Sequence, residues 1–497
     1  METIKRMLLS GSIYGKLMVL AGGIMLVPLF LLPFYPEEKG FWVYYAAPAV
    51  LSLVSGIVVC FGTMRTPDTL SDRRILALHG STPVLFAWIY LSLLGAVPFW
   101  ASGELTFTRA LFESVSGWTT TGLTVMIPSR LPHILLFQRS MMQYFGGLGF
   151  IILVTTIVRR KTAMSFYSAE GHVDRLMPNL MDSARLIIRI YLGLLGAGTL
   201  CYILAGIPAF DALCHSMSAL STAGFSTQDG SIGAFRNRPA EIITIVQMLL
   251  GATNFYVILL ILRRQFRKIW QESEIRLMAG LILVFTLPIS VILWQRCPMS
   301  LPESFHQALF GVVTTFSTTG YSLMDYSRWP GPALALLPVL MIVGGCAGST
   351  AGGIKLMRGV ILLKVTATGL HDRVDSPRNV TDNTFRRNQE DHPIDRQTLS
   401  DTFSFLMVYL LILAGGIFLV SWTADCSVSR AAFEFTSALG TVGLSNGLTA
   451  SAPAPTLWVI MAGMLIGRLE WAAVFVSLYS VFRSLCRIPA SGLSGSR

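Results

Sequence analysis

The chain has 497 residues, of which 53% are apolar and only 13% are charged. Ordinary globular chains carry about 25% charged residues, so a soluble protein of this size could not cover its surface with so few charges. The net charge of +11 would suggest nucleic acid in a soluble chain, but it is typical of basic cytoplasmic loops in a membrane protein. Composition therefore excludes a nucleic-acid-binding domain, a secreted disulfide scaffold and a disordered chain, and predicts a protein embedded in the lipid bilayer.

Ten apolar segments are long enough to cross the membrane, because a helix needs about 20 such residues to span the hydrocarbon core. They lie near residues 15–35, 41–63, 75–99, 134–158, 186–207, 240–262, 277–295, 333–364, 401–423 and 455–482. Lys and Arg concentrate between alternate spans, which predicts a cytoplasmic location for the N-terminus, 64–74, 159–189, 263–276, 355–397 and the C-terminus. We expect 371–400 to be a cytoplasmic loop, since it is too short and polar to bury a core.

Four segments rich in Ser, Thr and Gly lie between consecutive spans and share the pattern T-x-G-[LFY]-[ST]. They read SGWTTTGLT, SALSTAGFS, TTFSTTGYS and SALGTVGLS, and their glycines are Gly122, Gly224, Gly320 and Gly443. The residue two before each glycine is a threonine: Thr120, Thr222, Thr318 and Thr441. The residue directly before it varies: Thr121, Ala223, Thr319 and Val442. Four copies in corresponding places indicate an internal repeat, because unrelated loops have no reason to keep several columns in register.

Each repeat is expected to contain a span, a half-helix, a strand at the T-x-G turn and a second span. Irregular backbone at membrane depth survives only where it is buried in protein or lines a watery cavity. Glycine permits the φ values that turn carbonyl oxygens inward, and four such strands around one axis would replace the water shell of a monovalent cation. The sequence therefore predicts an all-α polytopic membrane protein with four pseudo-symmetric repeats around one pore and two extra N-terminal transmembrane helices.

This organisation divides the chain into six parts. We expect the two N-terminal helices in residues 1–70 and the cytoplasmic loop in 371–400. Repeats 1 to 4 then occupy 71–165, 166–265, 266–370 and 401–497, with filters at 119–124, 221–226, 317–322 and 440–445.

The span 333–364 contains the stretch GGCAGSTAGG at 344–353. A continuous helix is disfavoured there, since each glycine costs about 1 kcal/mol relative to alanine. One interpretation is close packing of helices through small residues. The other is an unwound loop below the filter that obstructs the pore and moves on gating. The candidate gating residues are Lys355, Arg468 and seven residues of this stretch: Gly344, Gly345, Gly348, Ser349, Thr350, Gly352 and Gly353.

Charged residues within spans are costly and usually functional. Arg468 lies in the last span, where it either pairs structurally with a carboxylate or loop carbonyl, or forms a barrier to cations and holds the gate. Lys355 ends the glycine-rich stretch, and we expect it on the cytoplasmic side rather than along the pore. Glu113 and Glu434 each precede a filter glycine by nine residues, and a structural role is favoured because carboxylates suit helix N-termini.

The chain resembles the Trk/Ktr/HKT superfamily of K⁺ transporters, in particular its bacterial TrkH/TrkG type, over nearly its whole length. Beyond the filters, the matching stretches are FGGLGF at 145–150, GFST and SIGAF within 224–235, GGCAGSTAGGIK at 344–355 and GRLE at 467–470. The resemblance implies K⁺ uptake across a bacterial inner membrane, with K⁺ bound at the four filters, selectivity over Na⁺, and the gating interpretation of the glycine-rich stretch. It also implies a homodimer and a cytosolic nucleotide-binding regulatory subunit of the NAD or ATP type.

Two other classes of function fit the sequence less well. A secondary symporter coupling K⁺ to H⁺ or Na⁺ would need a titratable relay at the bilayer midplane, and no chain of Asp, Glu or His occurs in the spans. An intramembrane enzyme acting on lipid carriers would leave the fourfold repeat unexplained. Without a Walker A motif or a dinucleotide fingerprint, we expect no cofactor in this chain, no enzymatic activity, and nucleotide binding by a partner only.

Overall fold

The computed structural model describes residues 12–64, 82–149, 180–374 and 383–485. Predictions about the two chain ends, about 65–81 and 150–179, and about 375–382 fall outside the described residues.

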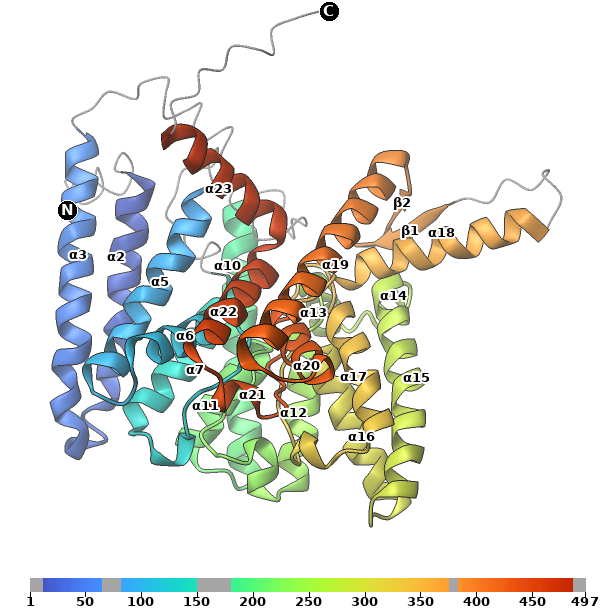
Figure 1. Ribbon diagram of the computed structural model, residues 1–497, viewed down its shortest axis with the longest axis horizontal. Coiled ribbons are helices and arrows are strands. Elements are labelled where there is room, and N and C mark those ends of the chain that lie inside the picture. Colours follow the sequence, from blue (N-terminus) through green and yellow to red (C-terminus); the bar gives the residue numbers. More distant parts are fainter. Residues whose placement is uncertain (1–11, 65–81, 150–179, 375–382, 486–497) are drawn as a thin grey trace, which may run out of the picture.

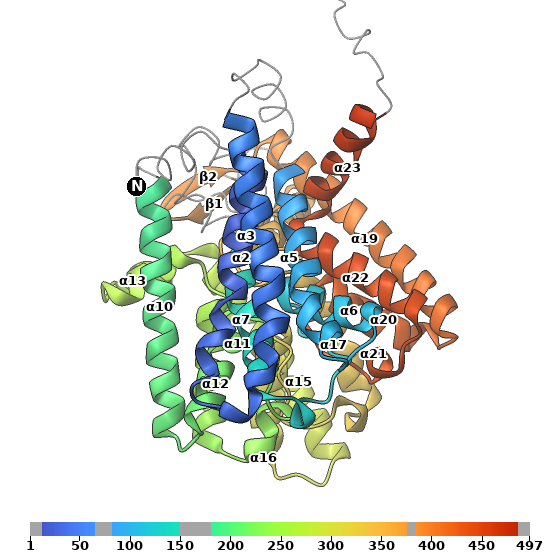
Figure 2. The ribbon, with the colours of Figure 1, turned by 90° about the vertical axis from the view of Figure 1, so that its left-hand side faces the viewer.

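Two helices precede the repeats, α2 (Ile13–Met25) and α3 (Trp42–Met64), joined through the 3₁₀ turns η1 (Val27–Leu31) and η2 (Pro36–Phe41). They pack closely because glycines face each other: a Cβ on Gly15 would lie 2.7 Å from the carbonyl oxygen of Gly56. Figures 1 and 2 show this pair standing at one flank of the molecule, beside α5 (Thr82–Ala101).

The same order of elements then occurs four times, as predicted. The long first helices are α5, α10 (Leu180–Leu204), α15 (Ser273–Arg296) and α19 (Arg396–Ala424). The short helices before the T-x-G turns are α6 (Phe107–Trp118), α11 (Ala209–Leu220), α16 (Leu301–Phe316) and α20 (Val428–Leu439). Each short helix ends four residues before its turn's glycine, so the register of the turn is the same in all four repeats.

The second helices are less regular than the first. They are α7 (His133–Leu148), α12 (Arg238–Gly251) with α13 (Phe255–Leu262), α17 (Gly331–Val343) with α18 (Leu356–Val374), and α22 (Ala454–Leu469) with α23 (Trp471–Leu485). Short elements complete the connections: η3 (Pro128–Arg130), η4 (Ser231–Phe235), η5 (Tyr326–Arg328), α14 (Phe266–Ile269) and α21 (Leu448–Ser451).

The prediction of continuous helices over 240–262 and 455–482 is wrong. The chain bends by 118° between α12 and α13 and by 106° between α22 and α23. Asn254 starts the new helix at the first bend, since its side chain accepts a hydrogen bond from the amide of Tyr256. At the second bend Glu470 adopts a φ of +58°, which no helix accommodates. The expected interruption of 333–364 is present, between Val343 and Leu356.

By length and apolar composition, six described helices can cross a membrane, and each of the two bent pairs adds one more candidate. The remaining two predicted spans are α7, whose description stops near its end, and the interrupted α17–α18. The prediction of a helical membrane protein built from four repeats and two additional helices is confirmed.

The predicted loop 371–400 contains regular structure. In its described part, α18 continues to Val374, strands β1 (Thr384–Arg387) and β2 (Glu390–Pro393) form an antiparallel hairpin, and α19 begins at Arg396. The backbone amides of Asn388 and Gln389 at the hairpin tip donate to Glu272, each at 3.0 Å. In Figure 1 the hairpin lies beside α18, which projects sideways from the helical body. The sequence did not reveal this hairpin, because its partners lie on α15 and at the residue before it, more than a hundred residues away.

Candidate ion site

The four T-x-G turns meet in one closed ring. A Cβ placed on Gly122 would lie 2.1 Å from the carbonyl oxygen of Ala223 in the next repeat, and one on Gly224 would lie 2.0 Å from that of Thr319. A Cβ on Gly320 would lie 2.2 Å from the oxygen of Val442, and one on Gly443 2.1 Å from that of Thr121, which returns to repeat 1. Each strand therefore packs its bare Cα against a main-chain carbonyl of its neighbour, and no larger residue fits.

The threonine two residues before each glycine adopts a strained backbone. The φ values of Thr120, Thr222, Thr318 and Thr441 are +54°, +52°, +54° and +51°. A left-handed conformation costs an L-residue about 1–2 kcal/mol, and it is an outlier for a β-branched side chain. The conformation closes the preceding short helix, because the next amide donates to a carbonyl five residues back, as Thr121 does to Ser116. The same strain in four places indicates a functional site.

The ring offers oxygen atoms and little else. Its residues Thr120 to Thr121, Thr222 to Ala223, Thr318 to Thr319 and Thr441 to Val442 are completely buried. Among the described residues, no group of three or more His, Cys, Asp or Glu side chains is arranged to hold a metal ion. Carbonyl and hydroxyl oxygens suit a hard, weakly charged cation and replace its hydration shell without binding it too tightly to leave.

Side chains behind the turns hold three of the four strands. In these three repeats, the side chain nine residues before the filter glycine forms a hydrogen bond with the hydroxyl group two residues after that glycine. The pairs are Glu113 and Thr124 at 2.8 Å, His215 and Ser226 at 2.9 Å, and Glu434 and Ser445 at 2.7 Å. In repeat 3 the corresponding residue is Gly311, and the ring of Trp329 occupies that space. The two carboxylates therefore support the strands from behind. They lie in the middle of α6 and α20 and not at the helix N-termini, where the sequence analysis placed their structural role.

The segment 344–355, called the glycine loop below, covers one side of the ring. The hydroxyl of Thr350 lies 3.0 Å from that of Thr222, and the amide of Gly352 donates to the hydroxyl of Thr318 at 2.9 Å. A Cβ on Gly352 would lie 2.0 Å from the hydroxyl oxygen of Thr441, so only glycine allows this approach. The loop thus touches the threonines of repeats 2, 3 and 4.

Arg468 reaches the remaining threonine and the loop together. Its guanidinium donates to the carbonyl of Thr350 at 2.8 Å, to the hydroxyl of Thr120 at 3.3 Å and to the carbonyl of Gly146. Arg468 is consequently a fixed positive charge beside the ring, bonded to the glycine loop through Thr350 and to the end of α7 through Gly146.

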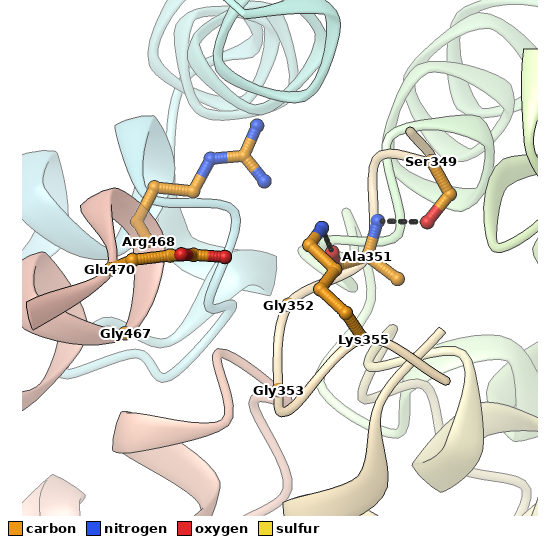
Figure 3. Close-up of a pocket in the computed structure, with 8 residues that line it drawn as sticks. All are labelled: Ser349, Ala351, Gly352, Gly353, Lys355, Gly467, Arg468 and Glu470. Carbon is orange, nitrogen blue, oxygen red and sulfur yellow. Dashed lines mark hydrogen bonds between the residues drawn. The ribbon is translucent and has the colours of Figure 1, made fainter. Parts of the chain in front are cut away.

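A small pocket separates the glycine loop from the bend between α22 and α23 (Figure 3). Its lining residues are Ser349, Ala351, Gly352, Gly353, Lys355, Gly467, Arg468 and Glu470. Lys355, which we expected on the cytoplasmic side, lines this pocket, and its ammonium donates to the carbonyl of Ala351 at 2.7 Å. Glu470 accepts two hydrogen bonds from Arg358 of α18 at 3.1 and 3.0 Å. The two broken helices are therefore joined beside the pocket.

Gly344 and Gly345, at the start of the loop, pack against its last residues. A Cβ on Gly344 would lie 2.1 Å from the carbonyl oxygen of Gly352. Gly348 lies beside the side chain of Asn254. All the candidate gating residues named from the sequence thus fall in or against one structural unit below the ring.

Two residues of the site were missed by the sequence analysis. Arg139 and Gln143 of α7 are buried and bond the main chain of the second T-x-G turn. Their signal was present: α7 carries buried long polar side chains within a predicted span, and two of them, four residues apart, lie on one face of the helix.

Comparison with known proteins gives consistent matches over most of the chain. The sequence matches the family described as TrkH, cation transport protein, over residues 56–302 and 298–482. It is 31% identical to the Trk system potassium uptake protein TrkH of Salmonella typhimurium, covering 95% of this chain and 98% of that one. It is also 31% identical to the Trk system potassium uptake protein TrkG of Escherichia coli, covering 92% and 94%. The crystal structure of the potassium transporter TrkH from Vibrio parahaemolyticus superposes with a TM-score of 0.81 at 28% identity, covering 93% and 97% of the two chains. The chain belongs to the TrkH family of cation transport proteins.

Proposed function

We propose that this chain mediates K⁺ uptake across the membrane of a bacterial cell, with the ring of T-x-G turns as its selectivity filter. The single observation that carries the proposal is the closed ring, in which each glycine rests against the carbonyl of the next strand. The names of the relatives, which describe potassium uptake proteins, support K⁺ as the ion. An inside-negative potential supplies about 2.3 kcal/mol per charge for every 100 mV, so no covalent chemistry is required.

The glycine loop and Arg468 act as the gate in this proposal. Together they cover the four threonines at one end of the ring, and a fixed guanidinium repels an approaching cation. The arrangement corresponds to a closed pathway. Conduction requires the loop to leave the threonines and Arg468 to release the carbonyl of Thr350.

The assembly follows from the same proposal. The relatives are named as parts of a Trk system, which supports a second component, namely a cytosolic regulatory subunit that binds a nucleotide of the NAD or ATP type. We further propose a homodimer in the inner membrane with both termini in the cytoplasm. The abundance of Lys and Arg between alternate spans supports this orientation.

The test is growth of a bacterial strain that lacks K⁺ uptake, at limiting external K⁺. The chain should restore growth, and changing Gly122, Gly224, Gly320 or Gly443 to serine should abolish that rescue while the protein still accumulates in the membrane. Rescue that survives all four changes would refute the filter assignment. Uptake that follows a proton gradient at zero membrane potential would instead indicate coupled symport.

A further inference from the structure

The helix α7 places two long polar side chains against the second T-x-G turn. Arg139 is 1% exposed and Gln143 is 0% exposed. They are four residues apart, so they lie on one face of the helix, one above the other. Both side chains come from repeat 1 but bond the backbone of repeat 2.

Gln143 forms hydrogen bonds with the residues on both sides of Gly224 in the second turn. Its amide nitrogen donates to the carbonyl oxygen of Ala223 at 2.6 Å, and its amide oxygen accepts from the backbone amide of Phe225 at 3.1 Å. The oxygen of Ala223 is also the one against which Gly122 of the first turn is packed. Gln143 therefore holds the second strand to helix α7 of repeat 1, at the carbonyl against which the first strand packs.

Arg139 holds the outer part of the same seam. Its guanidinium donates to Glu113 at 2.8 Å, to the carbonyl of Ser226 at 3.0 Å and to the hydroxyl of Thr124 at 3.1 Å. The guanidinium carbon also lies 4.1 Å from the ring centre of Phe225. Arg139 thus contacts the first strand at Thr124 and the second strand at Ser226. Because Arg139 and Gln143 lie on the same helix, these bonds also keep the second strand against Gln143.

The residues that correspond to Gln143 in repeats 2 and 4 cannot form its two hydrogen bonds. Three equivalent glycines align the second helices of the repeats: Gly146 of α7, Gly251 of α12 and Gly467 of α22. Each packs against the last carbonyl of its repeat's short helix, which belongs to Trp118, Leu220 and Leu439 respectively. Three residues before Gly251 and Gly467 are Met248 and Met464, both 0% exposed. A thioether donates no hydrogen bond. The seam between strands 1 and 2 is thus chemically different from those that α12 and α22 border.

We propose that Gln143 is a specificity-determining positioning residue, which holds the carbonyl of Ala223 at the spacing that fits K⁺. This inference rests on the proposed K⁺ uptake function. A strand that is held by its neighbour's amide cannot close around the smaller Na⁺ ion. When the donor is removed, the strand gains that freedom and the filter accepts Na⁺ more readily.

The experiment compares K⁺ uptake by cells carrying the full chain, Gln143→Met or Gln138→Met, with and without excess Na⁺. Met is the residue that repeats 2 and 4 have at this place. Gln138 is the matched control, because it is equally buried on α7 but bonds Tyr45 and the carbonyl of Gly95 instead of the ring. The readout is the factor by which Na⁺ raises the half-saturating K⁺ concentration, which does not depend on the amount of folded protein.

We expect Gln143→Met to increase this factor about two- to tenfold, the range set by one net hydrogen bond, and Gln138→Met to leave it unchanged. A fall in maximal uptake with an unchanged factor would show that Gln143 is merely structural and would overturn the proposal, as would an equal increase for both variants. If Gln143→Met does not accumulate, Gln143→Leu takes its place, since it is also apolar and cannot donate a hydrogen bond to the carbonyl of Ala223. Failure of the unaltered chain to take up K⁺ would refute the proposed function itself, whatever the variants do.

Discussion

Replacing Gly443 by alanine tests directly whether the ring depends on contact between neighbouring strands. Gly443 has a φ of +89°, and a Cβ there would lie 2.1 Å from the carbonyl oxygen of Thr121. Four residues further on, Gly447 has nearly the same φ, +88°, but a Cβ there would meet nothing within 4 Å. The two alanine variants therefore have a similar positive φ, and they differ in whether the added Cβ meets a neighbouring strand.

The expected magnitudes differ accordingly. The left-handed backbone costs either alanine about 1–2 kcal/mol. At Gly443, the carbonyl of Thr121 must also retreat by 0.9 Å, from 2.1 Å to the 3.0 Å that real Cβ contacts respect. Forced overpacking of this kind costs a further 1–3 kcal/mol or so. Because Gly122, next to Thr121, is itself packed on strand 2, the displacement passes around the ring and misplaces several oxygen atoms.

The assay is K⁺ uptake into cells that lack other K⁺ transporters, normalised to the amount of each variant in the membrane. We expect Gly447→Ala to retain most of the uptake and Gly443→Ala to lose it almost completely at low external K⁺. Equal uptake by the two variants would show that the strand contact does not control the ion site, and the argument from the closed ring would fail.

Further outcomes follow from other contacts. Arg139→Met leaves the buried carboxylate of Glu113 without its cationic partner and should lower the free energy of unfolding in detergent by about 3–5 kcal/mol. Arg185→Met removes a half-exposed ion pair with an N···O distance of 3.7 Å and should change the free energy of unfolding by less than about 0.5 kcal/mol. Equal losses in the two variants would contradict this. Deleting 346–351 should raise ion flux through the purified protein, and Glu274→Ala, which removes an acceptor for a loop amide at 2.8 Å, should raise it less; unchanged flux in both would exclude the loop as a gate. Phe385→Ala, by emptying a buried site under the hairpin, should speed limited proteolysis of the hairpin, and an unchanged cleavage rate would show that this contact does not hold it.

The features that the sequence predicted well are those encoded within a few residues. The T-x-G turn combines a threonine that ends a helix with a glycine that lets a neighbouring carbonyl approach, and both requirements can be recognised locally. The interruption after Val343 was predictable for the same reason, since five glycines in ten residues disfavour a helix wherever they occur.

The features that were missed depend on partners far away in the chain. The bend at Glu470 is stabilised by Arg358, 112 residues earlier, and Gln143 bonds Ala223, 80 residues later. Apolar composition is the same in a straight span and in a bent one, so hydropathy cannot distinguish them. Hydropathy also cannot predict that the backbone amides at the hairpin tip donate hydrogen bonds to Glu272.

A ring made from identical subunits would repeat every substitution four times, so an amide placed behind one strand would stand behind all of them. In this protein the quarters are linked in tandem, and each can mutate alone. A glutamine can therefore replace a buried methionine in a single quarter, and a tryptophan can fill the place of an acidic side chain in another. Gene duplication followed by fusion thus allows the conduit to be adjusted one quarter at a time, in steps small enough for the remaining three to preserve its shape.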